Sequence, residues 1–329
     1  MSQFPSHLVP AIETAFQQVF NTTEVTDISL LAGGLSASSV YKIVVQDRPY
    51  VLKLDTGLPA NRATNLALAA AAGIAPSLHY QDTTTGISIS DLIAGKPIRT
   101  VFTPEILTGK LANTIKAIHA VPCHNGGDDL LTAIDGMVNS FRQTGMLSGP
   151  VFDECFRHYE IIRNKYPWQD TDKVFSHNDL NPNNILCDGE RIWIIDWDTA
   201  FLNDRYVDLA NAANFFVHSE EQEKLLLDVY FNYTTDDYKK ARFYIMRQLC
   251  RIIYAMLMFR LAAQGKTADH KHNQDMEGIS LKEFGALMGA GKLSLASYEG
   301  QLMYGKALLN KAVHQMRSSR FTASLAQLG

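Results

Sequence analysis

The sequence predicts an α+β fold in which a small N-terminal lobe, built on an antiparallel sheet, precedes a larger and mainly helical C-terminal lobe. Three observations support this fold class. Residues 28–54 hold three short strand-like segments separated by polar turns. From Pro104 onward, apolar residues recur mainly at helical spacing. One segment, residues 174–199, interrupts that helical pattern. We place the lobes at residues 1–94 and 95–329.

The N-terminal lobe begins with a helix and continues as strands. Apolar residues at helical spacing predict the first helix: Ile12, Phe16, Val19 and Phe20. Strand-like segments follow at 28–32, 40–45 and 50–54, and a short polar turn containing Asp47 and Pro49 joins the last two. These three segments predict a small antiparallel sheet.

The rest of the chain is predicted mainly as helix, and the two exceptions are residues 87–93 and residues 174–199. Residues 61–72 are rich in Ala and Leu, which favours a helix that stops at Gly73. An apolar segment, residues 87–93, then leads into a hinge at 94–97. The second exception is the interruption at 174–199, where candidate catalytic residues are concentrated.

Composition excludes several classes of protein. The chain has 329 residues, 46% of them hydrophobic, so it is long enough to bury a large core. Its net charge of −4 and the absence of a long Lys/Arg run argue against nucleic acid as a partner. The most apolar later run, residues 252–259, is too short to cross a bilayer. No signal-peptide pattern is present, so we expect a cytoplasmic protein without membrane insertion.

The cysteines predict neither a zinc site nor a disulfide framework. They are widely separated and contain no C-x-x-C pair. We expect four reduced thiols: Cys123, Cys155, Cys187 and Cys250.

The interruption contains a motif of the form H-x-D-x₄-N, made by His177, Asp179 and Asn184, with Asp196 twelve residues later. Asp188 and Gly189 form a typical hairpin turn between two short apolar segments. The chain is therefore predicted to double back and to bring Asn184 and Asp196 to the same open end of a hairpin. Amide and carboxylate oxygens are ligands that Mg²⁺ accepts together with phosphate oxygens.

The segments HNDLNPNNIL and IIDWD resemble the aminoglycoside phosphotransferase and choline kinase family, within the protein-kinase-like superfamily. The resemblance extends from about residue 31 to residue 216. It implies an ATP- and Mg²⁺-dependent enzyme that transfers the γ-phosphate to the hydroxyl of a small molecule. Asp179 would be the catalytic base, His177 would brace the loop, and Asn184 and Asp196 would bind the metal.

A nucleotide site is expected upstream. The loop at residues 33–39 could direct backbone N–H groups toward phosphates, with Gly34, Ser36 and Ser38 as candidates, although an ordinary hairpin has the same composition. Period-two alternation places Val51 and Lys53 on one face of a strand. By the resemblance, Lys53 would reach the α and β phosphates, and Val51 would line the adenine pocket. A lone strand Lys is otherwise usually solvated.

The resemblance also implies an adenine-binding hinge at residues 90–93, with Asp91 and Ile93 as candidates, although this segment could equally be a buried strand. The sequence departs from the pattern at two relevant positions. Asn65 stands where the helix after Lys53 should offer Glu, so the partner of Lys53 is left open. Asp198 replaces the Gly of D-F-G, which removes a flexible residue and adds a carboxylate.

Acidic residues after the catalytic motif point to a cationic acceptor. Asp198 and Asp204 are candidate substrate residues, because they make that side of the site acidic. Tyr206 is a candidate aromatic contact for an ammonium group, although core packing is the commoner role of such a residue. An amine-bearing alcohol, such as choline or ethanolamine, is slightly favoured over an aminoglycoside. Homoserine-like, sugar and thiamine-like alcohols remain open.

A second class of function is a nucleotide-binding pseudokinase or a protein-interaction scaffold, for which Asn65 is an early sign of decay. Against it, Lys53, Asp179 and Asp196 are all present, and a scaffold needs none of them. A protein kinase is disfavoured because no A-P-E-like segment follows Asp196.

Overall fold

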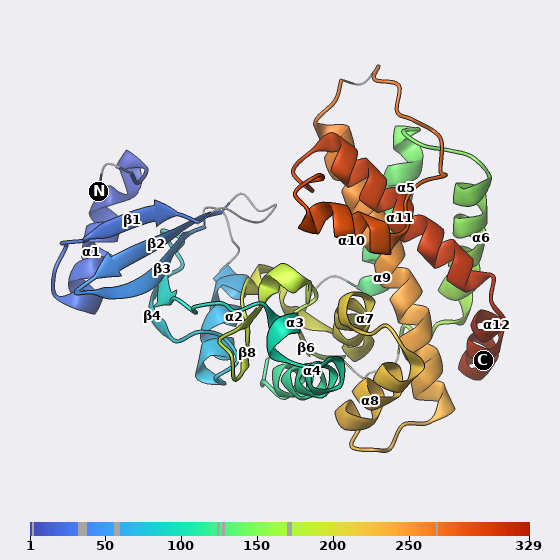
Figure 1. Cartoon of the computed structure of the whole chain (residues 1–329), viewed down its shortest axis with the longest axis horizontal. Coiled ribbons are helices and arrows are strands. Elements are labelled where there is room, and N and C mark those ends of the chain that lie inside the picture. Colours follow the sequence, from blue (N-terminus) through green and yellow to red (C-terminus); the bar gives the residue numbers. More distant parts are fainter. Residues whose placement is uncertain are drawn as a thin grey trace. The chain divides into compact units, whose positions relative to one another are not determined.

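The computed structural model describes residues 1, 3–31, 38–55, 60–123, 126, 129–169, 173–267 and 269–329, with the backbone alone at 60–63. The chain forms two compact units (Figure 1). Unit 1 comprises Met1–Gly126, Val174–Asn203 and Phe215–Tyr230. Unit 2 comprises Gly127–Lys173, Asp204–Asn214 and Phe231–Gly329. These units differ from the predicted lobes because the segment 174–203 packs within unit 1. The lobe boundary near residue 94 stays a prediction.

The N-terminal sheet has five antiparallel strands rather than the three predicted. The strands are β1 (Asp27–Leu30), β2 (Ser39–Val45), β3 (Arg48–Leu54), β4 (Leu78–Asp82) and β5 (Ile87–Asp91). Their order is β1-β2-β3-β5-β4. The apolar run from residue 87 thus supplies β5, which pairs directly with β3.

The two faces of this sheet have different roles. Helix α1 (Val9–Phe20) follows the short η1 (Ser6–Leu8), and its buried Ile12 and Phe16 belong to one core with Leu52 and Leu54 of β3. Because side chains alternate along a strand, Val51 and Lys53 lie on the opposite face, where they are half-buried. Apolar burial thus fixes the register of β3 and directs Lys53 away from the core.

Helices complete the rest of unit 1. They are α2 (Ala60–Ala71), α3 (Ile98–Val101), α4 (Pro104–His119) and α8 (Glu220–Tyr230). Helix α2 ends as predicted near Gly73, which has a φ of +69°. Thr103 caps α4 by accepting a hydrogen bond from the Ile106 N–H, and Pro104 opens that helix. Helix α4 packs against α8.

The segment that interrupts the helical pattern consists of short strands and turns. They are β6 (Lys173–Ser176), η2 (Pro182–Asn184), β7 (Ile185–Cys187), β8 (Ile192–Ile194), η3 (Trp197–Thr199) and β9 (Phe201–Asp204). Strands β7 and β8 form the predicted antiparallel hairpin, and β6 pairs with β9. The Ile194 N–H donates to the Ile74 carbonyl and the Lys96 N–H to the Cys187 carbonyl, so the hairpin is attached to the segments that follow α2 and β5.

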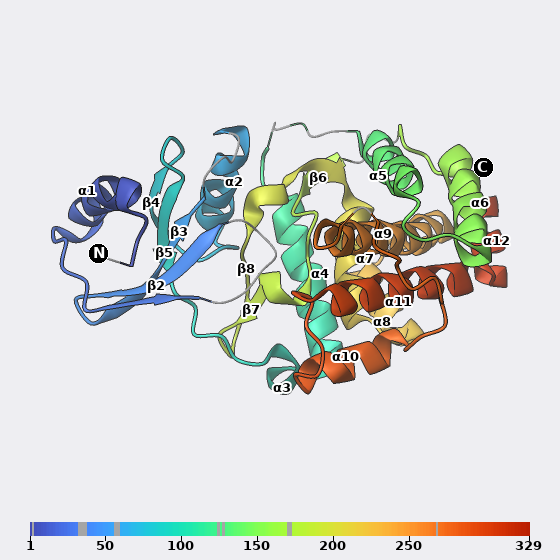
Figure 2. The same ribbon diagram turned by 90° about the horizontal axis from the view of Figure 1, so that it is seen from above.

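Unit 2 is helical in the part that the structure describes. Its helices are α5 (Leu130–Thr144), α6 (Pro150–Lys165), most of α7 (Arg205–Phe216), α9 (Asp237–Gln264), α10 (Leu281–Gly289), α11 (Tyr298–Met316) and α12 (Ser319–Leu328). Figure 2 shows α11 lying along the central helix α9, and α5 and α12 also contact α9. Among the described helices, none is both long and apolar enough to span a membrane.

Candidate active site

His177 holds the catalytic loop from within. Its side chain is fully buried after β6, and its ring meets the Trp197 ring edge-on at 4.8 Å. Nε2 donates to the Ile195 carbonyl over 2.9 Å, while Nδ1 accepts from the Asp179 N–H at 3.3 Å. Since a carbonyl only accepts, this arrangement requires the tautomer protonated at Nε2. The imidazole therefore links the loop to the end of β8, and its role in the proposed chemistry stays a prediction.

A second set of hydrogen bonds, which the sequence analysis did not predict, holds the same loop. It involves Asn178, Thr199 and Asn203. Asn178 adopts a left-handed φ of +67°, and its amide nitrogen donates to the Thr199 carbonyl over 2.8 Å. Asn203 donates to the Asn178 amide oxygen over 2.8 Å, and the Thr199 hydroxyl donates to the His177 carbonyl. Such a conformation is costly unless its surroundings hold it, and here three hydrogen bonds do so.

Asp179 and Asn184 are joined directly. The Asn184 amide nitrogen donates to the Asp179 carbonyl over 2.9 Å and to its carboxylate over 3.0 Å. The amide nitrogen is engaged there, and the metal-binding role predicted for the amide oxygen of Asn184 stays a prediction. The Ile195 N–H donates to the Asn184 carbonyl, and Asp196 follows with a φ of +64°. The hairpin thus brings Asn184 and Asp196 to one end, as predicted.

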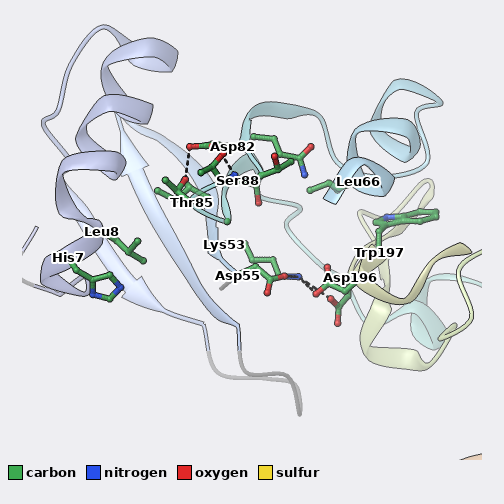
Figure 3. Close-up of a pocket in the computed structure, with 16 residues that line it drawn as sticks. His7, Leu8, Lys53, Asp55, Leu66, Asp82, Thr85, Ser88, Asp196 and Trp197 are labelled. Carbon is green, nitrogen blue, oxygen red and sulfur yellow. Dashed lines mark hydrogen bonds and ion pairs between the residues drawn. The ribbon is translucent and has the colours of Figure 1, made fainter. Parts of the chain in front are cut away.

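Lys53 contacts three carboxylates (Figure 3). Its Nζ lies 2.5 Å from Asp198 Oδ2, 3.2 Å from Asp196 Oδ1 and 3.2 Å from Asp55 Oδ2. Burial by itself lowers the pKa of Lys53, but Asp198, then Asp196 and Asp55, outweigh it and raise the pKa. The ammonium is therefore charged at neutral pH.

The carboxylate of Asp198 contacts Lys53, and its predicted contact with the substrate stays a prediction. Burial raises the pKa of Asp198 to about 6, against the effect of Lys53, and the negative charges of Asp196 and Asp55 add to the rise.

Asn65 has a structural explanation. Its side chain is fully buried, and its amide nitrogen donates to the Ala200 carbonyl over 2.7 Å and to the Trp197 carbonyl at 3.4 Å. A glutamate at this position could not donate these hydrogen bonds. Asn65 therefore attaches α2 to η3, directly after Asp196, instead of pairing with Lys53.

The structure describes some of the predicted nucleotide-binding residues and leaves others outside its described ranges. Val51 lies opposite Ser90 in the pairing of β3 with β5, which brings it beside the predicted hinge. Gly34 and Ser36 fall outside the described residues. Ser38 is half-buried directly before β2.

The two hinge candidates differ. The carboxylate of Asp91 bonds the His79 ring over 2.7 Å, so this side chain is engaged at the edge of the sheet. Ile93 is half-buried in the segment after β5.

Asp204 and Tyr206 belong to a buried cluster. The Asp204 carboxylate accepts from Arg242 over 2.7 Å and from the Tyr166 hydroxyl over 2.7 Å. The Arg242 guanidinium lies 4.5 Å from the centroid of the Tyr206 ring, which is 1% exposed. Arg242 thus pairs with the carboxylate and lies over the ring, and the substrate roles of Asp204 and Tyr206 stay predictions. Arg242 lies 38 residues beyond Asp204 in the sequence, and no local signal indicates that they pair.

A pocket of about 400 Å³ opens beside Lys53. It is lined by Lys53, Asp55, Asp196 and Asp198, by Leu66 of α2, by the turn between β4 and β5, and by His7 and Leu8 (Figure 3). Three of its carboxylates, those of Asp55, Asp196 and Asp198, lie next to the lysine. Such a pocket, with convergent charged groups, is typical of a ligand site.

A β3 lysine, an H-x-D-x₄-N loop and an Asp at the end of the following hairpin define the kinase-like class of phosphotransferases. The chain belongs to the phosphotransferase enzyme family, whose sequence pattern matches residues 27–244. Protein LicA of Haemophilus influenzae is 30% identical over 123 residues, covering 31% of this chain and 46% of that protein. A LicA homolog of Mycoplasma capricolum is 36% identical over 63 residues, or 19% of this chain and 26% of that protein. The chain thus spans less than half the length of these relatives.

Solved structures share the fold. A choline/ethanolamine kinase family protein from Mesorhizobium loti has a TM-score of 0.70 at 16% identity, covering 98% of this chain and 99% of its own. Choline kinase LicA from Streptococcus pneumoniae has a TM-score of 0.57 at 18% identity, with 80% and 93% covered. A spectinomycin phosphotransferase in complex with ADP and spectinomycin has a TM-score of 0.59 at 15% identity, with 93% and 98% covered. The fold is therefore the α+β, protein-kinase-like fold predicted from the sequence.

Proposed function

We propose that this protein transfers the γ-phosphate of ATP to the hydroxyl group of a small, amine-bearing alcohol. The observation that carries the proposal is the joining of Asp179 to Asn184 at the end of the hairpin that also presents Asp196. These are the three positions that a kinase-like centre uses for the acceptor and for the metal.

Each residue takes one role. Asp179 would accept the proton of the substrate hydroxyl, whose oxygen forms a bond to phosphorus as the bond to the departing ADP oxygen breaks. Lys53 would hold the nucleotide phosphates from β3, and His177 would keep the loop in place. The hydrogen bonds of the Asn184 amide support this division, since they set the direction of the Asp179 carboxylate.

The hard oxygen donors of Asn184 and Asp196 fit Mg²⁺. The amide of Asn184 has its nitrogen committed to Asp179, which leaves its oxygen for a cation. When bound, Mg²⁺ would neutralise phosphate charge. The side chain of Asp196 is 38% exposed and therefore accessible to a bound nucleotide.

The amine-bearing acceptor is supported by likeness. Similar structures include proteins described as choline/ethanolamine kinase, choline kinase and spectinomycin phosphotransferase, and choline and spectinomycin are amine-bearing alcohols. The contacts of Arg242 with Asp204 and Tyr206 leave the particular alcohol open.

A screen of ADP release tests the proposal. The purified chain is incubated with MgATP and with choline, ethanolamine, aminoglycosides, or neutral sugars of similar size. We expect release above basal hydrolysis with one or more amines, and a phosphorylated product detected by mass spectrometry. Asp179→Asn is the control that should remove this signal. Transfer to neutral sugars alone would contradict the amine-bearing acceptor, and transfer to no alcohol would contradict the proposed activity.

A further inference from the structure

Asp55 is held in place beside Lys53 by the backbone. It directly follows β3, two residues after Lys53, and Figure 3 shows the two side chains together at the pocket. Its N–H donates to the Gly86 carbonyl over 2.8 Å. Gly86 has a φ of +71°, and a Cβ there would lie 1.7 Å from the Asp55 carbonyl oxygen. The turn between β4 and β5 therefore requires glycine in order to fit closely against Asp55.

The carboxylate of Asp55 is directed at Lys53. Its Oδ2 lies 3.2 Å from Nζ, and the side chain is 18% exposed. Among the described residues, that buried oxygen accepts no hydrogen bond, so the ion pair is the contact that the structure gives it. A buried carboxylate oxygen without any partner is costly, so the ion pair with Lys53 compensates for the burial of Oδ2.

Helix α2, which follows Lys53, offers no carboxylate for this role. In protein kinases the strand lysine pairs with a glutamate of the following helix. Here α2 reads ANRATNLALAAA, which contains no acidic residue. Asn65 of that helix is committed to the carbonyls of Trp197 and Ala200. Asp196 and Asp198 do contact Lys53, but Asp196 is also the proposed metal ligand, so its carboxylate must be shared when MgATP binds.

We propose that Asp55 is a positioning residue of Lys53, supplied by the residue that directly follows the same strand instead of by the neighbouring helix. This role of Asp55 rests on the proposed function, in which Lys53 binds the nucleotide phosphates. With this partner two residues away, part of the orientation of Lys53 is set locally, at the end of β3. Asn65 then fixes a different part, the turn after Asp196.

Asp55→Asn tests the proposal, because it removes the charge and keeps the shape. We expect a rise of about tenfold or more in the Kd of MgATP, measured by calorimetry, and a similar fall in kcat/KM for MgATP, as for a lost charge-assisted contact. The KM of the acceptor and the Tm should stay close to wild type. Asp27→Asn is the matched control, since Asp27 pairs with Lys42 at 3.7 Å on the same sheet. Asp27→Asn should change neither the Kd of MgATP nor the kcat/KM for MgATP.

A double-mutant cycle shows whether Asp55 acts through Lys53. In a Lys53→Met background, Asp55→Asn should have no further effect on the Kd of MgATP. An equal effect in both backgrounds would overturn the proposal, as would a wild-type Kd for Asp55→Asn alone. If that variant does not fold, Asp55→Ser is judged by the same cycle.

The cycle also separates this proposal from the proposed function. It uses nucleotide binding alone, so it remains decisive if no alcohol is phosphorylated. Failure of the wild-type chain to bind MgATP would overturn both.

Discussion

Asp179 is the residue on which the proposed chemistry depends most directly. Its carboxylate is oriented by the Asn184 amide, and its N–H by His177. A positioned base contributes about 10² to 10⁴ in rate. Asp179→Asn should therefore lower kcat by at least about a hundredfold while MgATP binding stays nearly intact. Steady-state ADP release and calorimetry on the same preparation measure both. Turnover at the wild-type rate would remove Asp179 from the mechanism.

The two proposed metal ligands should differ in strength. A carboxylate binds a hard dication more strongly than an amide does. Asp196→Ala should therefore reduce Mg²⁺-dependent ATP binding more than Asn184→Ala. Titrations of ATP with and without Mg²⁺ into both variants make the comparison. A stronger loss in Asn184→Ala would argue against the metal assignment. Because Asn184 also holds Asp179, the kcat of this variant is measured separately.

At the scale of elements, the turn of the β7–β8 hairpin depends on Asp188. Its carboxylate accepts hydrogen bonds from the backbone N–H groups of Arg191 and Glu190 and from the Trp193 indole. These bonds, the one from Arg191 most of all and then those from Trp193 and Glu190, lower the pKa of Asp188 from 3.8 to about 2. Because the folded-state pKa is lowered, this stabilisation is fully present above about pH 4 and is lost as the pH falls toward 2.

Asp188→Ala should therefore reduce the free energy of unfolding at pH 7 by about 1–2 kcal/mol. The effect is limited to this size because the lost hydrogen bonds are accessible to solvent. The difference from wild type should shrink as the pH is lowered from 4 toward 3. Urea unfolding at several pH values measures this, with the exposed Glu13→Ala as the control. A difference that stays constant with pH would mean that the charge of Asp188 is unimportant.

Local pattern predicted these elements better than it predicted their partners. The hairpin followed from Asp188 and Gly189 between apolar segments, and the direction of Lys53 from alternation along β3. Alternation also places Asp55 on the Lys53 face, a signal that was available in the sequence. The bonds of Asn65 to the carbonyls after Asp196 could not be predicted, because they join residues more than 130 positions apart and depend on tertiary packing.

At the scale of the whole molecule, the cluster around Arg242 joins three separate parts of unit 2. Arg242 of α9 bonds Asp204 before α7, and Asp204 also accepts from Tyr166 after α6. Arg242 is 2% exposed. Removing one partner of a buried ion pair costs about 3–5 kcal/mol, since the other charge remains buried.

Arg242→Ala should therefore lower the free energy of unfolding by about that amount, whereas Arg242→Met combined with Asp204→Asn should lose clearly less. Chemical unfolding of the single and double variants gives the comparison. The same variants test the original assignment of Asp204, since a substrate contact would instead raise the KM of the acceptor in Asp204→Asn while leaving the unfolding free energy unchanged.

The three carboxylates around Lys53 affect which form of ATP the site would accept in the cell. A bare nucleotide carries its full negative charge toward a place where carboxylates outnumber the ammonium three to one. The chelated nucleotide arrives with much of that charge already cancelled. The protein would therefore respond to the concentration of the magnesium chelate rather than to total ATP, and a fall in free magnesium would slow it even while ATP stays plentiful.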